Sequence, residues 1–283
     1  MVSAPVRVEQ AQFANKRGVG LRRACALVGI SRSSLYYRRI KPFKDGGIIE
    51  RMKELSRKHP RFGARRIRIL LKRQGIVIGK TRCRRLWAQA CLQVPRKKRR
   101  KISSRRVQGI KPTKANSVWS YDFVHDMCAN GQKLKCLTVV DEYTRECLAI
   151  EVSARIRASD VIDTLTRLMS AHGTPCYLRS DNGPEFISSA LLTWAKQSGI
   201  DVALIEPGKP WQNGHNESFN GKFRDECLSA EWFRNRMEAK IVIEDWRNHY
   251  NTIRPHSSLN YCTPIEFKNS IRAPKNYEVE ASR

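Results

Sequence analysis

The chain has 283 residues, of which 41% are apolar, and its formal net charge is +28 at pH 7. This length allows one medium domain and one or two small ones, and no apolar run reaches the ~18–20 residues that a membrane-spanning helix needs. The N-terminus lacks the apolar core of a signal peptide, and the nine cysteines form no Cys-x-x-Cys pair, so we expect an intracellular protein with neither a zinc site nor a disulfide framework.

The positive charge is concentrated before residue 122. Residues 55–121 contain 22 Lys and Arg and no Asp or Glu, whereas residues 122–283 carry 20 basic and 22 acidic residues. Such an excess indicates a polyanionic partner, because each neutralised phosphate releases counterions. Residues 95–115 contain a basic run without apolar periodicity, and they are predicted to be a basic linker.

The first region, residues 1–45, includes the pattern of a helix-turn-helix over residues 20–39. Gly29 breaks a short apolar helix, and Ser31 is expected to cap a second helix over residues 32–39. Short polar and aromatic side chains on a second helix suit contacts in the major groove of DNA. The expected contact residues are Arg32, Ser33, Ser34, Tyr36 and Arg38. The alternative is an ordinary helical hairpin.

A second basic helical module, similar to a helix-turn-helix, is predicted over residues 46–94. Apolar residues recur there at helical spacing in successive stripes, and Thr81 is expected to cap the last helix. We expect a winged or plain helix-turn-helix. Its DNA contacts are expected from arginines on the helices, namely Arg65, Arg66, Arg82, Arg84 and Arg85.

After the linker the pattern changes to short apolar strands. Residues 118–124, 134–141 and 147–152 predict an antiparallel meander, which a helix capped by Ser159 follows. The remaining order is strand 176–180, helix 188–197, strand 202–205 and helices at 214–227 and 230–250. This order is typical of a mixed α/β domain.

Three carboxylates lie where this order would bring them together. Asp122 is inside the first strand, Asp181 ends the fourth, and Glu217 is near the start of a helix. Buried carboxylates are costly unless something compensates their charge, and hard cations such as Mg²⁺ prefer carboxylate oxygens. Because two such ions can clamp the attacking and leaving oxygens of a phosphoryl transfer, the trio is a candidate metal and catalytic site. Competing carboxylates nearby are Asp126, Asp141 and Glu185.

Four longer motifs carry a family resemblance. They are Trp-Ser-Tyr-Asp-Phe-Val at residues 119–124, Ser-Asp-Asn-Gly-Pro-Glu-Phe at 180–186, the segment 207–221 and the segment 251–261. With Arg-Phe-Gly-Ala-Arg-Arg-Ile at residues 61–67, they resemble the integrase-core transposases of bacterial insertion sequences, in particular the second-reading-frame protein whose core is similar to retroviral integrase. The resemblance covers nearly the whole chain.

The resemblance implies a ribonuclease-H-like α/β fold. Its mixed sheet has three antiparallel strands plus two parallel ones, with helices, and small all-α helix-turn-helix modules precede it. The core is expected over residues 116–270, with a tail over 271–283. The two aspartates and the glutamate of the family map to Asp122, Asp181 and Glu217. The resemblance implies two Mg²⁺ or Mn²⁺ ions per site, nicking at element ends and strand transfer by the freed 3′-hydroxyl.

Further DNA contacts are expected around the helix that carries Glu217, from Lys209, Trp211, Gln212, Asn213, Asn220 and Arg224. The first implied partner is double-stranded DNA, which includes the terminal inverted repeats of the element and the target DNA. The others are a second copy of the chain, in a synaptic dimer or larger assembly, and an upstream-frame fusion partner. The implied location is the bacterial cytoplasm, at the nucleoid, with no membrane partner. The alternatives are an end-binding repressor without catalysis and a nuclease that cuts RNA–DNA hybrids.

Overall fold

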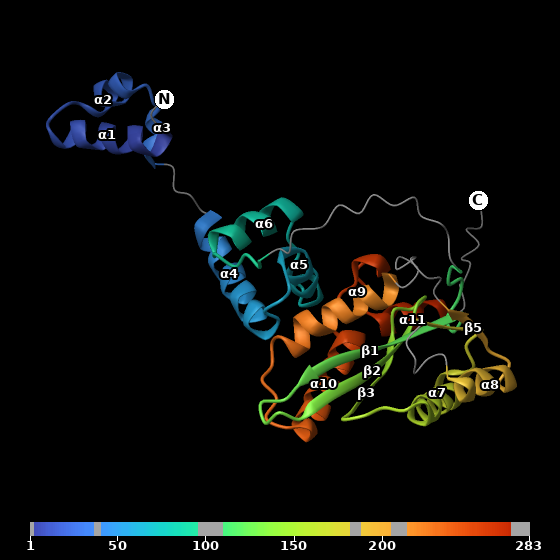
Figure 1. Ribbon diagram of the computed structural model, residues 1–283. Coiled ribbons are helices and arrows are strands. Elements are labelled where there is room, and N and C mark those ends of the chain that lie inside the picture. Colours follow the sequence, from blue (N-terminus) through green and yellow to red (C-terminus); the bar gives the residue numbers. More distant parts are fainter. Residues whose placement is uncertain (1–2, 37–40, 96–109, 182–187, 205–213, 273–283) are drawn as a thin grey trace, which may run out of the picture. The chain divides into compact units, whose positions relative to one another are not determined.

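The computed structural model describes residues 3–36, 41–95, 110–181, 188–204 and 214–272 (Figure 1). The chain divides into two compact units. The first contains Met1–Pro60 and Leu70–Gln93, and the second contains Arg61–Ile69 and Val94–Arg283. Across these described ranges, no helix combines the length and the apolar character that a bilayer span requires.

The first three helices are α1 (Ala4–Lys16), α2 (Leu21–Val28) and α3 (Arg32–Tyr36). Ala11 of α1 and Ala24 and Cys25 of α2 are buried between them. Gly29 ends α2 with φ of +67°, a left-handed conformation that favours glycine, as the sequence predicted. Helix α1 was not predicted, because its apolar residues do not gather on one face.

The next three helices are α4 (Lys41–Lys58), α5 (Ala64–Arg73) and α6 (Lys80–Gln89). Most residues of the predicted apolar stripes are buried; in the first unit they include Met52, Leu55, Leu70, Leu71, Leu86 and Trp87. The prediction that Thr81 caps the last helix is wrong. Gly79 holds the N-cap position in an extended conformation, so Thr81 lies in the first turn of α6.

The second unit contains a mixed five-stranded sheet. Its strands are β1 (Val118–Met127), β2 (Lys133–Asp141), β3 (Cys147–Ser153), β4 (Tyr177–Ser180) and β5 (Asp201–Leu204). The spatial order is β3-β2-β1-β4-β5, with antiparallel pairing from β3 to β1 and parallel pairing from β1 to β5. The sequence predicted this combination of three antiparallel and two parallel strands, and the fold is ribonuclease-H-like.

Helices cover both faces of the sheet. They are α7 (Ala158–His172), α8 (Ser189–Gln197), α9 (Gly214–Phe223), α10 (Arg236–Thr252) and α11 (Pro264–Arg272). One apolar core joins the sheet to α7 and α8, and the other joins the opposite face to α9 and α10. Figure 1 shows α7 and α8 together on one side of the sheet.

Within the described residues all nine cysteines are free, and six of them are buried.

Several boundaries differ from the predictions, and helix α11 was not predicted. Ser159 does not cap α7, because Arg157 holds the N-cap position and its amide donates to Asp160 Oδ2 (2.7 Å). Helix α9 ends at Phe223 and a π-helical turn, Arg224–Leu228, continues it. Helix α10 begins at Arg236 because Asn235 caps it by accepting from the Glu238 amide.

Candidate active site

Asp122 lies in the middle of β1 and faces α9. Successive side chains of a strand point to opposite faces. Tyr121 packs in the core shared with α7 and α8, whereas Val124 packs in the core shared with α9 and α10. Asp122 therefore shares the α9 face with Ser120 and Val124. The strand places a half-buried carboxylate beneath a helix.

The parallel pairing of β1 with β4 brings Asp181 to Asp122. Ser120 is opposite Arg179 in the register of these strands, and continuing that register by two residues places Asp181 beside Asp122. Burial raises the pKa of Asp122 to about 6, the negative charge of Asp181 adds to this rise, and the Phe123 amide, Asn220 and Arg224 oppose it. The two aspartates are thus close enough to repel each other.

Two asparagines of α9 form hydrogen bonds with residues of the sheet. Ser120 Oγ donates to Asn216 Oδ1 (3.2 Å), and Asn220 Nδ2 donates to Asp122 Oδ2 (2.7 Å). Thr138 Oγ1 on β2 donates to Asn220 Oδ1 (3.2 Å), which fixes the amide orientation. Glu217 lies between these asparagines in the sequence, but its side chain is exposed. The helix therefore brings Glu217 within one turn of the residue that contacts Asp122.

The three predicted carboxylates do not form one cluster in this structure. No group of three or more His, Cys, Asp or Glu side chains in the described ranges is close enough to hold a metal ion. Asp122 and Asp181 interact, but the two do not form such a group with Glu217. The pair still fits a divalent cation, because both are oxygen donors and a cation would offset the repulsion and burial that raise the pKa of Asp122.

Arg224 lies at the same edge of the site. Its Nη1 donates to the His125 carbonyl (3.3 Å), its side chain is exposed, and its charge lowers the pKa of Asp122. Asn220, in contrast, is buried and engaged with Asp122 and Thr138. Asn220 was predicted as a DNA contact, but the structure makes it a partner of the candidate catalytic aspartate.

A buried charged network borders the start of α9. Arg179 Nη1 donates to both carboxylate oxygens of Glu142 (2.9 and 2.7 Å). Arg145 donates to His215 Nδ1. Burial, then Arg145, Arg179 and Lys222, lower the pKa of His215 to about 4. The ring is therefore neutral at pH 7, and its approach to Glu142 (3.8 Å) is not an ion pair.

The sequence analysis did not find this network. The hydrogen-bond partner of Glu142 is Arg179 on β4, which is distant in the sequence. The His215 ring is half-buried. Thr138 and Asn216 were missed, because a polar residue inside an apolar pattern does not reveal its partner.

The predicted DNA contacts of the first module are partly exposed. Arg32, Ser33 and Tyr36 are exposed on α3, and Ser34 is half-buried. Ser31 precedes α3, and its hydroxyl bonds to those of Ser33 and Ser34 (2.8 and 2.9 Å). Other predicted residues lie outside the described residues, namely Arg38, Glu185, Lys209, Trp211, Gln212 and Asn213.

Several predicted arginine contacts have protein partners. Arg82 Nη2 and Arg85 Nη2 donate to Asp45 of α4 (2.6 and 2.7 Å), and these pairs lower the pKa of Asp45. Arg66 lies over the Phe62 ring (5.2 Å) with Nη1 3.5 Å from Glu226. Arg65 and Arg84 are exposed and stay predicted DNA contacts.

Only 3% of the surface of Asp45 is accessible. The hydrogen bonds from two arginines keep this buried carboxylate charged.

Models of known protein families match both the region that contains the sheet and the helical region before it. Integrase core domain models match residues 112–210 and 198–264, and an HTH-like domain model matches residues 43–100. A 31.7 kDa protein of insertion element IS407 from Burkholderia multivorans is 44% identical over 91% of this chain and 94% of its own length. The putative transposase InsK of IS150 from Escherichia coli is 27% identical over 87% of this chain and 92% of its own.

A solved structure shows the same fold. The simian T-cell lymphotropic virus intasome in complex with the PP2A regulatory subunit B56 gamma contains a chain that matches with a TM-score of 0.52 and 16% identity, covering 76% of this chain and 74% of that one. At this identity the match concerns the fold alone. The IS407 relative and the core domain matches show that the chain belongs to the family of bacterial insertion-sequence transposases with an integrase-like core.

Proposed function

We propose that this transposase nicks DNA at the ends of its element and joins the freed 3′-hydroxyl to target DNA in a reaction that depends on divalent metal. Asp122, Asp181 and Glu217 would hold the metal, either Mg²⁺ or Mn²⁺ and two ions in the full complex. When bound, such ions activate water or a hydroxyl and neutralise charge on the phosphate. The donor set supports this proposal, since all three residues are carboxylates.

One observation carries the proposal. Asp122 and Asp181 extend from neighbouring parallel strands, and together with burial the second raises the pKa of the first to about 6. A fold that places two carboxylates together has to offset their repulsion, and cation binding does so. Glu217 is exposed on the helix that Asn220 ties to Asp122, one turn before Asn220, so the same side of this helix would present its carboxylate.

The chain's own residues would position the DNA. Asn220 holds one oxygen of Asp122, which leaves the carboxylate in a single orientation. Arg224 is exposed beside the site and can pair with a phosphate. The exposed polar face of α3 and the basic residues before Asp122 would supply the binding to duplex DNA. Joining two ends requires at least two subunits, and the fusion partner stays a prediction.

Replacing Asp122 with Asn tests the proposal. The variant keeps the shape but loses the charge, so we expect nicking of a linear duplex with the element ends to fall to background in Mg²⁺. DNA binding should be nearly unchanged. Asp126→Asn is the matched control, because this carboxylate lies on the same strand and accepts from the Met127 amide (2.9 Å). Full nicking by Asp122→Asn, or an equal loss in Asp126→Asn, would contradict the proposal.

An end-binding repressor without catalysis is not favoured. Such a protein has no need of two adjacent carboxylates, one of them half-buried with a raised pKa. The same assay separates the two functions, because a repressor would bind the ends without nicking them at any Mg²⁺ concentration.

A further inference from the structure

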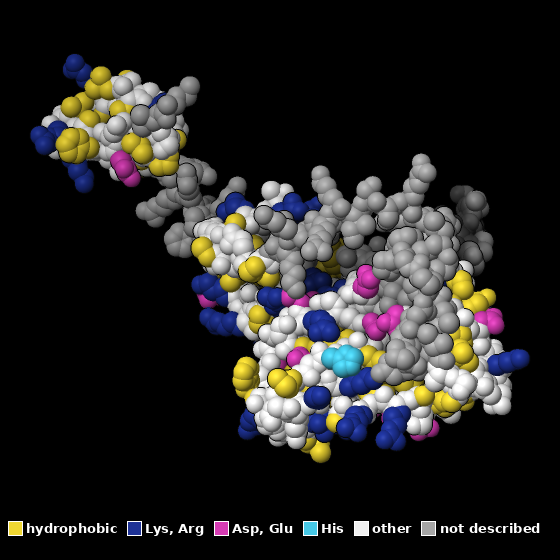
Figure 2. Space-filling model, in the orientation of Figure 1, with side chains coloured by type: hydrophobic (Ala, Val, Ile, Leu, Met, Phe, Trp, Pro, Cys, Tyr) yellow, Lys and Arg dark blue, Asp and Glu magenta, His cyan; other side chains and the backbone are white. Residues whose placement is uncertain are grey.

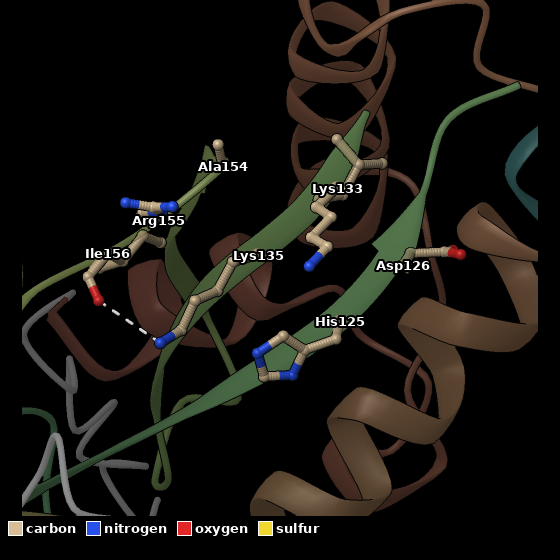
Figure 3. Close-up of a pocket in the computed structure, with 8 residues that line it drawn as sticks. His125, Asp126, Lys133, Lys135, Ala154, Arg155 and Ile156 are labelled. Atoms are coloured by element: carbon tan, nitrogen blue, oxygen red, sulfur yellow. Dashed lines mark hydrogen bonds between the residues drawn. The ribbon is translucent and has the colours of Figure 1, made fainter. Parts of the chain in front are cut away.

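A hollow of about 250 Å³ opens on the second unit, away from Asp122. Figure 3 shows it between the ends of β1 and β2 and the segment that leaves β3. His125 lines it from β1, Lys133 and Lys135 from β2, and Arg155 from the connection to α7. Four nitrogen-bearing side chains thus converge from three segments.

These side chains lie on the sheet face opposite to the candidate active site. His125 is paired with Lys135, and Met127 with Lys133, so His125 and the two lysines share one face. Asp122 lies on the other face, toward α9. Helix α7 begins only at Ala158 and covers the sheet further along, where Leu137 and Val139 are buried. The hollow is therefore the part of this face that extends beyond the helix.

The hollow has a surplus of positive charge. Asp126 is its acidic neighbour, and Figure 3 shows that its carboxylate points away from the lysines. Glu151, which shares this face of the sheet, is paired with Arg167. In the part of the chain that the structure describes, neither Lys133 nor Arg155 forms an ion pair, and both are exposed.

The ammonium group of Lys135 is held in place by contacts within the protein. Lys135 Nζ donates to the Ile156 carbonyl (3.4 Å) and lies 4.0 Å from the centre of the Phe123 ring. The cation–π contact and the hydrogen bond limit the motion of a normally flexible side chain. A positioned ammonium loses less conformational entropy on binding an anion than a freely moving one.

We propose that this hollow binds the phosphodiester backbone of duplex DNA, at a second site on the face of the core opposite to Asp122. Lys133, Lys135 and Arg155 would pair with phosphate oxygens, and His125 would add a hydrogen bond. An open hollow between exposed cations suits a continuous polyanion, because one phosphate can enter while its neighbours stay outside. Lys and Arg side chains also gather around a histidine on the face of the core visible in Figure 2.

The proposal rests on the proposed function in one respect, namely that DNA is the substrate. It adds that a nucleic acid contacts the core on two faces. A second duplex segment, such as target DNA or the far part of a bent end, could be held while the first lies at Asp122. Backbone contacts of this kind carry no sequence information, so binding there should be independent of sequence.

Lysine acetylation of the whole, unmodified chain tests the contact. We expect a non-specific linear duplex to slow the acetylation of Lys133 severalfold, measured by mass spectrometry of peptides. Lys196 is the internal control, because it is exposed on α8 at a distant position in the sequence. Equal acetylation of Lys133 with and without DNA would overturn the proposal. Protection by inorganic phosphate alone, at the same phosphate concentration, would also overturn it and indicate a small-anion site.

Variants give an independent measurement. In Lys133→Gln/Arg155→Gln, the slope of the logarithm of DNA affinity against the logarithm of salt concentration should become shallower by about 1.8, since each lost contact removes about 0.9. Lys196→Gln should leave the slope unchanged. If the double variant has the same slope as Lys196→Gln, the proposal is contradicted. This result would leave the metal-dependent nicking assay untouched, so the two proposals can fail separately.

Discussion

At the scale of single residues, the Asp122 carboxylate is controlled by four neighbours with different effects. Burial and Asp181 favour its protonated form, whereas the Phe123 amide, Asn220 and Arg224 stabilise its charged form. The resulting pKa is about 6. Small changes in these neighbours should therefore move the pH range in which the site can hold a cation.

Asn220→Ala should show this control. The substitution removes the donor to Asp122 Oδ2, and loss of such a supporting hydrogen bond typically lowers metal affinity or activity about 10–100-fold. Because Asn220 lowers the pKa of Asp122, that pKa should rise further. The carboxylate is charged above its pKa, so nicking should be lost at a higher pH as the solution is acidified.

The measurement is the nicking rate against pH at a fixed, sub-saturating Mg²⁺ concentration. Raising Mg²⁺ should move the acid side of the profile to lower pH in both proteins, because metal competes with the proton. Asn248→Ala, an exposed position on α10, serves as the control. If the nicking rate is lower but its dependence on pH is unchanged, Asn220 acts only through the stability of the fold.

At the scale of elements, buried polar contacts join segments that are far apart in the sequence. Arg179 connects β4 to the turn after β2 through Glu142, and it also donates to the Ile110 carbonyl (2.7 Å). Asn251 of α10 accepts from the Cys147 amide (2.9 Å) and donates to its carbonyl (2.8 Å) at the start of β3. These contacts fix the strand ends around the candidate site.

Removing one partner of the Arg179–Glu142 pair should be costly. Arg179→Met leaves Glu142 buried without its partner, and such a loss typically costs about 3–5 kcal/mol of unfolding free energy. Arg179→Met/Glu142→Gln should cost less than the single change, because no carboxylate then remains buried without Arg179. Urea denaturation measures both. A double variant that is less stable than Arg179→Met would contradict this account of the pair.

The elements themselves were largely predictable from the pattern of apolar residues. The first three strands were predicted within about three residues of their observed bounds, since short apolar runs between turn residues are a strong signal for buried strands. The helix starts were less predictable. Gly79 and Arg157 hold N-cap positions that were assigned to Thr81 and Ser159, and both have an extended backbone that can start a helix.

At the scale of the whole molecule, basic charge before residue 122 is combined with a nearly neutral remainder. Part of that charge is already engaged within the protein. Arg82 and Arg85 both bond to Asp45, and their pairing lowers the pKa of this carboxyl, so Asp45 stays charged through the neutral range. The net charge therefore overstates the number of cations available to DNA.

Asp45→Asn should make the two arginines available. We expect tighter non-specific DNA binding and a salt dependence steeper by up to about 1.8 in logarithmic slope, as two further phosphate contacts become possible. Fluorescence anisotropy at several salt concentrations measures this slope. Glu50→Gln is the control, because Glu50 is on the same helix and pairs with exposed Lys53. Weaker binding and a shallower slope would indicate that Asp45 positions the arginines for DNA.

The sequence by itself determined the order of the strands and of most helices, the family and the three candidate carboxylates, because apolar periodicity and long motifs are local features of the chain. Only the tertiary structure decided that Asn220 supports Asp122 and that Arg82 and Arg85 pair with Asp45. These facts depend on which side chains meet across elements distant in the sequence. Hydrogen bonds and charge pairs act over a few ångströms in space, and no spacing along the chain records that distance.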